Sequence, residues 1–131
     1  MSLPEGLGLL AVHLDKEARL IRADFADHVA APEMAYEDFV RWPLHLEGTP
    51  FQQAVWHALM HIEPGQRRTY RWVAEQIGRP RAVRAVANAI AANPVALRVP
   101  CHRVIRSDGR LGGYAWGVEK KAALLHWETF V

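Results

Sequence analysis

The sequence of 131 residues has a single cysteine, Cys101, and no long apolar run. One thiol excludes an internal disulfide framework and makes a reducing, cytoplasmic setting the expected one. No apolar stretch approaches the roughly 18 residues that a membrane-spanning helix needs. The N-terminal MSLPEGLGLL has no basic segment ahead of its apolar residues, so we expect no signal peptide and no membrane partner. These features predict a soluble globular protein of one domain, or of one domain with a small appendage.

Acidic and basic residues are distributed unevenly, although the net charge is only +2. Residues 1–50 contain four basic and nine acidic side chains, whereas residues 51–131 contain twelve basic and five acidic ones. From Arg67 to Arg106 there are nine arginines and one acid, Glu75. This asymmetry favours a polyanion as the partner of the second half, with a solvated basic surface as the alternative.

Residues 1–49 are predicted to form a small β-containing element. The stretch LLAVHLDKEARLIRADFA alternates apolar and charged residues on either side of DKEA, which is typical of a hairpin. The stretch APEMAYEDFVRW predicts a short helix that starts near Pro32. The segment LEGTP at residues 46–50 marks the division from the second part, residues 50–131.

Residues 50–131 carry stronger helix signals. Thr49 precedes a proline and the apolar spacing of FQQAVWHALMHI, as an N-cap does. Thr69 is the expected cap of TYRWVAEQIG, which closes on Gly78. A further helix, RPRAVRAVANAIAANP, stops before Pro94. Two short helices joined by a glycine-containing turn predict a helix-turn-helix.

The second helix of this pair has two distinct faces. Val83, Val86 and Ile90 fall on one stripe at helical spacing, which is the expected core side. The opposite face holds Arg81, Arg84, Ala85, Asn88 and Ala92. Basic and small side chains allow a backbone to approach a polyanion closely. We therefore favour nucleic acid binding over an ordinary alanine-rich helix.

The C-terminal segment contains a strand signal, a turn and a last helix. In VALRVPCHRVIRSDG, Leu97 and Val99 alternate with a polar residue and predict a strand, which resumes at Val104, and SDG predicts a tight turn. The helix GVEKKAALLHWE follows, with Glu128 at the edge of its inward stripe. The residues expected to face inward are Val118, Ala122 and Leu125.

Cys101 is a candidate nucleophile. A lone thiol is more often a small buried apolar group, but three arginines lie within five residues of this one. Positive charge favours the thiolate, which is the reactive form. In an extended backbone His102 would point away from the sulfur, so a bend at Pro100 or a bridging water is needed if His102 is to act as its base. Glu128 is the expected orienting group for His102.

The motif PCHRV, followed by GGY and a helix and preceded by FQQAVW, TYRWVA and RAVRAVANAIAANP, resembles the O6-alkylguanine-DNA alkyltransferases. The resemblance covers about residues 46–128. It implies an α+β fold: a mostly helical DNA-binding and catalytic domain with a winged helix-turn-helix, preceded by a shortened N-terminal β-containing element. It also implies a monomer that binds double-stranded DNA through the minor groove and flips the damaged base.

The activity implied by the resemblance is stoichiometric repair without a cofactor or metal. Cys101 takes the alkyl group of O6-alkylguanine once, and O4-alkylthymine is a second candidate substrate. His102 is the water-mediated base, Glu128 orients it, and Asn93 braces the active-site turn. Tyr114 protonates the leaving guanine. On the DNA side, the implied contacts are Arg84 in the gap left by the flipped base, Tyr70 at a phosphate, and Arg81, Ala85, Asn88 and Arg103.

The chain departs from the family pattern in three ways. Its N-terminal part of about 50 residues is shorter than is usual. That part has no cysteine, so we expect no zinc site of the kind that some members carry there. Ala115 and Trp116 stand where some relatives have serine and glycine, and Trp116 is expected to narrow the pocket against bulky alkyl groups.

Other sites and functions are less favoured by the sequence. His57 and His61 are four residues apart, but Ala58 replaces the glutamate of the HExxH zinc motif, so ordinary surface histidines are expected. A non-catalytic alkyltransferase-like DNA binder is the alternative function, against which Cys101 argues. A helix-turn-helix regulator needs base-reading side chains that the small-residue face lacks. A thiol hydrolase needs an oxyanion-hole glycine pattern, which does not adjoin Cys101.

Overall fold

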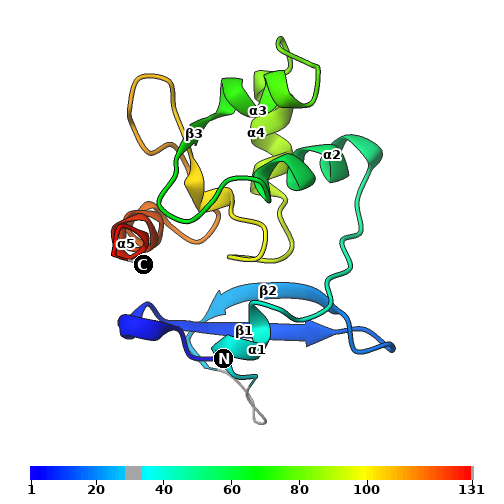
Figure 1. Cartoon of the computed structure of the whole chain (residues 1–131), viewed down its shortest axis with the longest axis vertical. Helices are drawn as coiled ribbons and strands as arrows, with labels where there is room; N and C mark the ends of the chain where they lie inside the picture. The colour runs from blue at the N-terminus through cyan, green and yellow to red at the C-terminus, as the bar shows by residue number, and fades with distance from the viewer. Residues whose placement is uncertain (29–33, 131) are drawn as a thin grey trace.

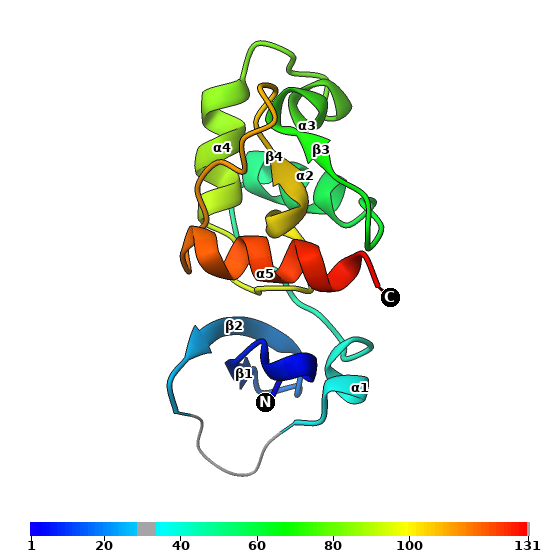
Figure 2. The same ribbon diagram turned by 90° about the vertical axis from the view of Figure 1, so that its left-hand side faces the viewer.

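The computed structural model describes residues 1–28 and 34–130, which form two parts that lie one above the other in Figures 1 and 2. In chain order the elements are η1 (Pro4–Gly6), β1 (Leu9–Leu14), β2 (Leu20–Ala26), α1 (Tyr36–Phe39), α2 (Pro50–Leu59), β3 (Arg68–Thr69), α3 (Tyr70–Gln76), α4 (Val83–Ala91), η2 (Cys101–Arg103), β4 (Val104–Ile105) and α5 (Val118–Glu128). β1 pairs with β2 in an antiparallel sheet, and β3 pairs with β4 in a short parallel one. The predicted α+β class is confirmed.

The predicted N-terminal hairpin is formed by β1 and β2. Their register pairs Leu10 with Phe25. In the turn between the two strands, the Asp15 carboxylate accepts hydrogen bonds from the backbone N–H of Glu17 (3.0 Å) and of Arg19 (2.8 Å). The predicted helix start near Pro32 lies outside the described residues. The helix that is described, α1, occupies the middle of the predicted segment.

Side-chain caps start the two helices that precede α4. The hydroxyl of Thr49 accepts from the backbone N–H of Gln52 (3.1 Å), and the Gln52 side chain accepts from the N–H of Thr49 (2.9 Å), which is a capping box. Thr69 accepts from the N–H of Trp72 at 3.0 Å. Gly78 follows α3 with φ +74°, a conformation that favours glycine. Both predicted caps and the predicted stop are confirmed.

The two faces of α4 are also confirmed. Val86 and Ile90 are buried and Val83 is half-buried against the same core. The exposed residues are Arg81, Arg84, Ala85, Asn88 and Ala92. Arg81, however, lies in the turn before α4 rather than on the helix. The reason is that the N–H of Ala82 closes this turn on the carbonyl of Arg79 (2.9 Å), so the helix begins only at Val83.

The strand predicted at Leu97 and Val99 is absent from the described structure. Leu97 has φ +70°, and the chain from residue 95 to residue 99 forms a compact loop. The Asn93 side chain closes this loop, because its oxygen accepts from the N–H of Val95 (2.9 Å) and its amide donates to the carbonyl of Val99 (2.9 Å). The tight turn predicted at SDG is present, with Gly109 at φ +86°.

The inward face of α5 was predicted wrongly. Val118 and Ala122 are exposed, and Leu125 alone of the predicted set is buried. The buried residues are Lys121, Leu124, Leu125 and Glu128. A lysine can face inward here because its ammonium donates to two backbone carbonyls of the preceding loop, which offset the loss of water. None of the described helices is long and apolar enough to cross a membrane.

The hydrophobic core of the N-terminal part includes residues from the second part. One cluster joins α2, α3 and α4, whereas the other joins the hairpin and α1 with Val95 and Ala96. The N–H of Ala23 in β2 donates to the carbonyl of Pro94, and the N–H of Ala96 donates back to the carbonyl of Ala23, both at 2.9 Å. The loop that leads to Cys101 is therefore paired with β2.

Candidate active site

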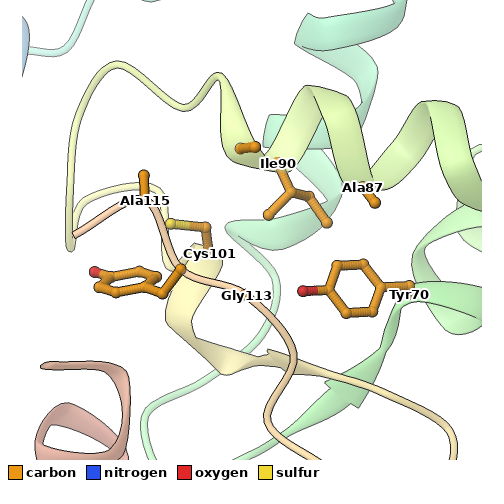
Figure 3. Close-up of a pocket in the computed structure, with 8 residues that line it drawn as sticks. Tyr70, Ala87, Ile90, Cys101, Gly113 and Ala115 are labelled. Carbon is orange, nitrogen blue, oxygen red and sulfur yellow. The ribbon is translucent and has the colours of Figure 1, made fainter. Parts of the chain in front are cut away.

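A pocket of about 360 Å³ opens beside Cys101. Its lining residues are Tyr70 from α3, Ala87, Ile90 and Ala91 from α4, Cys101 from η2, and Gly113, Tyr114 and Ala115 from the loop before α5. In Figure 3 the sulfur lies on the side of Cys101 nearest Ala115, and the Tyr70 hydroxyl points toward Cys101 from the other side. The helix-turn-helix thus supplies one wall of the pocket.

Cys101 is held at the start of a 3-10 turn. This turn is the bend expected after Pro100, whose carbonyl accepts from the N–H of Arg103 at 3.0 Å. The amide of Asn93 donates to the sulfur at 3.1 Å and to the carbonyl of Val99. Cys101 is only 4% exposed, so the sulfur is reached through the pocket.

The thiol of Cys101 is protonated at neutral pH. Burial raises its pKa to about 11, and the hydrogen bond from Asn93 and the charge of Lys121 offset only part of this effect. The expectation that neighbouring arginines stabilise the thiolate was wrong, because their donors bind elsewhere. Arg98 binds backbone carbonyls of the N-terminal part. Arg103 binds Glu128, and Arg106 binds Asp108.

His102 is a neutral imidazole next to the thiol. It is 1% exposed, and burial lowers its pKa although Glu128 opposes the shift. Its Nε2 lies 3.0 Å from a carboxylate oxygen of Glu128. This contact favours the neutral tautomer with its proton on Nε2, toward Glu128, and leaves Nδ1 without a hydrogen-bond partner within the described residues. His102 is therefore free to accept a proton, but it does not bond directly to the sulfur.

Glu128 is an ionised carboxylate. Burial alone would raise its pKa, but the contacts with His102 and Arg103 overcome this and hold the pKa at about 2. Arg103 donates to both carboxylate oxygens through Nε (3.1 and 3.0 Å) and to the carbonyl of Ile62 through Nη1 (2.6 Å). These bonds argue against the predicted DNA contact of Arg103, because few of its donors remain for a phosphate.

Two tyrosines, Tyr70 and Tyr114, line the pocket. Burial raises the pKa of Tyr114, and its hydroxyl is buried with no hydrogen-bond partner in the described part of the chain. Burial and the nearby sulfur also raise the pKa of Tyr70. The sequence predicts Tyr70 at a phosphate, whereas the structure places it in the same pocket as Cys101. Both hydroxyls are protonated and able to donate.

Lys121 belongs to the site although sequence reasoning missed it. The side chain is buried, and its ammonium donates to the carbonyls of Leu111 (2.5 Å) and Gly113 (3.1 Å), which hold the pocket loop against α5. Burial lowers its pKa to about 8, against the effect of Cys101. One signal was available: Lys121 lies seven residues before Glu128, and this spacing puts both on one face of a helix.

Trp116 packs behind the pocket rather than in its wall. Its ring makes edge-on contacts with Tyr114 (5.2 Å between centroids) and with Phe25 of β2 (6.0 Å). Ala115 lines the pocket instead. The narrowing expected from Trp116 can therefore act only through the position of Tyr114.

The histidine pair on α2 lies away from this site. His57 and His61 are exposed and line a separate groove between α2 and α3. Among the described residues there is no group of three or more histidine, cysteine, aspartate or glutamate side chains placed to hold a metal ion.

Comparison with known proteins gives consistent matches. The family model of the 6-O-methylguanine DNA methyltransferase DNA-binding domain matches residues 50–130. The bifunctional transcriptional activator/DNA repair enzyme Ada of Escherichia coli is 56% identical over 87 residues, which are 66% of this chain and 25% of Ada. A methylated-DNA–protein-cysteine methyltransferase of Mycobacterium tuberculosis is 53% identical over 85 residues, or 65% of this chain and 52% of that protein. The matched segment thus spans a quarter to about half of these two relatives.

Two solved structures are also similar to the chain. The structure of M. tuberculosis OGT in complex with DNA has a TM-score of 0.82 and 36% identity, covering 92% of this chain and 86% of that one. The structure of S. pombe Atl1 with damaged DNA containing O6-carboxymethylguanine has a TM-score of 0.57 and 28% identity, covering 63% and 79%.

Replacing Lys121 by methionine should raise the pKa of Cys101, because the substitution removes a buried positive charge near the sulfur. Each unit of increase lowers the thiolate fraction at neutral pH about tenfold, so alkylation of the thiol by iodoacetamide should slow accordingly. The measurement is the alkylation rate near pH 7, where Lys121, with a pKa of about 8, still carries its charge. The control is Lys120→Met, since Lys120 faces Phe25 of β2. An alkylation rate near pH 7 equal to that of the parent in Lys121→Met would contradict the electrostatic role.

Glu128 should make the protein sensitive to acid. Because its pKa is lower in the folded state than its ordinary value of 4.5, the carboxylate stabilises the fold above about pH 4.5. This stabilisation is lost as the pH falls toward 2. Glu128→Gln should flatten the fall in the free energy of unfolding over this range, as measured by urea denaturation. Glu17→Gln, in an exposed ion pair, should leave the slope unchanged.

Proposed function

Because the chain belongs to the 6-O-methylguanine DNA methyltransferase family, we propose that it repairs DNA by transferring an alkyl group from O6 of guanine to Cys101. O4-alkylthymine is the second candidate substrate. One observation carries the proposal: the buried sulfur of Cys101 opens into a pocket whose wall is the helix-turn-helix. A base can reach the sulfur only after leaving the double helix, so DNA binding and base flipping are coupled to the chemistry.

The exposed face of α4 is the proposed DNA contact. Arg84 projects from this face and fills the gap that the flipped base leaves, while Ala85 and Asn88 let the helix approach the minor groove. Arg81 contacts the backbone from the turn before the helix. Arg103 is omitted from this set, since its guanidinium is bound to Glu128.

The protonation states of the site are set for alkyl transfer. His102 accepts the proton of Cys101 through a bridging water, and Glu128 stabilises the resulting imidazolium. The sulfur attacks the alkyl carbon, and the bond between that carbon and O6 breaks. The electron pair passes into the guanine ring, which takes a proton from a tyrosine hydroxyl, and the proton that His102 accepted returns through water to the tyrosinate. Asn93 holds the sulfur in place throughout.

The proton donor is Tyr114 by the family resemblance, and Tyr70 is the alternative. Both tyrosines remain candidate donors, because the Tyr70 hydroxyl points toward Cys101. The other parts of the proposal are those expected from the sequence. The protein acts as a monomer in the cytoplasm, without a cofactor or metal. Residues 1–49 support the catalytic part, residues 50–131.

The rival function is a non-catalytic binder of alkylated DNA. It is less favoured, because a relative that is 53% identical over 85 residues is named a methylated-DNA–protein-cysteine methyltransferase. The position of Cys101 favours catalysis, since a thiol in the pocket wall would meet any alkyl group that enters. The two functions differ in their products. Only the transferase leaves unmodified guanine in the DNA and an alkyl group on the protein.

Incubation with a double-stranded oligonucleotide containing O6-methylguanine should therefore add one methyl group per protein, measured by intact-protein mass and mapped to the Cys101 peptide. With the DNA in excess, repair should stop at one equivalent, because the thioether is inert and the chain has no second thiol to receive the group. Cys101→Ser should bind the oligonucleotide without transfer. Multiple turnover, or methyl on another residue, would contradict the mechanism.

Arg84→Ala should impair repair of double-stranded DNA while leaving the reaction with free O6-methylguanine unchanged, since Arg84 lies outside the pocket lining. We expect a loss of at least about tenfold with the duplex, equivalent to about 1.4 kcal/mol. Single-turnover rates with both substrates test this, and Arg22→Met, an exposed arginine of β2, is the control. Equal losses with both substrates would remove the proposed role.

The two tyrosines can be separated by single hydroxyl deletions. The variant that loses the proton donor should slow transfer by roughly two powers of ten or more, whereas the other should change the rate little. Tyr114→Phe and Tyr70→Phe are compared at saturating DNA so that binding effects do not contribute. A large loss in Tyr70→Phe alone would move the assignment from Tyr114 to Tyr70.

A further inference from the structure

A second cavity, of about 240 Å³, lies beside the His102–Glu128 pair. It shares no lining residue with the pocket of Cys101. One of its walls contains the His102 ring and the Glu128 carboxylate. Another contains Tyr36 and Phe39 of α1 together with Val40, the residue that follows the helix. The proposed base is thus bordered by a space that the substrate does not occupy.

Arg98 fastens α1 over this cavity. Its Nη1 donates to the carbonyl of Phe39 (2.7 Å) and to the carbonyl of Trp42 (2.8 Å), at and just beyond the C-terminal end of the helix. Carbonyls at a helix end lack partners within the helix and attract a cation. Helices shorter than about 12 residues are marginal in water by themselves, and α1 spans only Tyr36–Phe39, so contacts made from outside must fix it.

Two further features support a fixed arrangement. Leu97, next to Arg98, has φ +70°, which a non-glycine residue adopts only where its surroundings enforce it. The ring of Tyr36 makes an edge-on contact with Trp127 of α5 at 6.2 Å between centroids. α1 is therefore attached at both ends, through Tyr36 to α5 and through Arg98 to the active-site loop.

We propose that Arg98 is a positioning residue that holds α1 as a cap over the His102–Glu128 pair and so limits the water that reaches this pair during alkyl transfer. The inference rests on the proposed function only for the kinetic part of its test. Arg98 acts through α1 and touches neither the sulfur nor the pocket of Cys101.

The cap affects the basicity of His102. Burial is the main cause of its low pKa, and the charged or titratable groups that face it are Glu128 and Lys121 from α5 and Arg103 and Cys101 from η2. Tyr36 of α1 lies near Glu128, and Arg98 lines the same cavity as His102. Loosening α1 would admit water and remove part of the burial effect. The pKa of His102 would then rise, more imidazole would be protonated at acid pH, and less would be able to accept the thiol proton.

The test compares Arg98→Met with the parent, using the full chain and the O6-methylguanine oligonucleotide. We expect the acid limb of the pH–rate profile to move up by about one unit, which lowers the rate about tenfold at pH values below the pKa of His102 and leaves the rate above pH 8 within about twofold. Arg98→Lys keeps a donor for the α1 carbonyls and should recover most of the loss. Arg22→Met is the matched control. A uniform loss at every pH would overturn the proposal and leave a structural role.

A second measurement does not depend on alkyl transfer. The pKa of the His102 ring can be followed by NMR in the absence of DNA, with the signal identified by its loss in His102→Gln. It should rise in Arg98→Met and fall in Val40→Phe, which fills the mouth of the cavity from an exposed position. An unchanged His102 pKa in both variants would overturn the proposal. Failure of the parent to accept a methyl group would instead count against the proposed function alone.

Discussion

The site depends on the hydrogen bonds that the side-chain carboxamide of Asn93 makes. Its oxygen accepts from Val95, and its amide donates to Val99 and to the sulfur of Cys101. These bonds fold the chain after α4 into the loop that pairs with β2 and presents the thiol to the pocket. Since the group is buried, its removal would leave backbone donors and acceptors unpaired, at a cost of about 1–3 kcal/mol each. The same side chain thus shapes the loop and positions the nucleophile.

Burial determines how the site is used. A thiolate poised by nearby arginines would react with any electrophile that enters, whereas the thiol of Cys101 is neutral and flanked by a neutral His102 and an ionised Glu128. In the proposed reaction, deprotonation therefore has to accompany attack on an alkyl group already in the pocket. If each molecule reacts once, as proposed, this restraint prevents reactions without a lesion, each of which would consume a molecule.

The sequence predicted the features that depend on local structure. The caps at Thr49 and Thr69 and the two faces of α4 follow from neighbours within one or two turns, and the structure contains them. The failures occur where a side chain binds a partner outside its own element. Lys121 faces inward because two carbonyls of the loop before α5 accept its hydrogen bonds, and Arg98 binds carbonyls at the end of α1, about 60 residues earlier in the chain. The apolar spacing within one helix does not identify such partners.

The short N-terminal part is more than an appendage to the catalytic part. Its hydrophobic core is completed by Val95 and Ala96, which belong to the active-site loop, and β2 exchanges two backbone hydrogen bonds with that loop. Phe25 of β2 contacts Trp116, which in turn contacts Tyr114 of the pocket. The hairpin therefore supports both the segment that carries Cys101 and the opposite pocket wall. The backbone bonds between β2 and residues 94 and 96 thus help to fix the thiol relative to the helix-turn-helix.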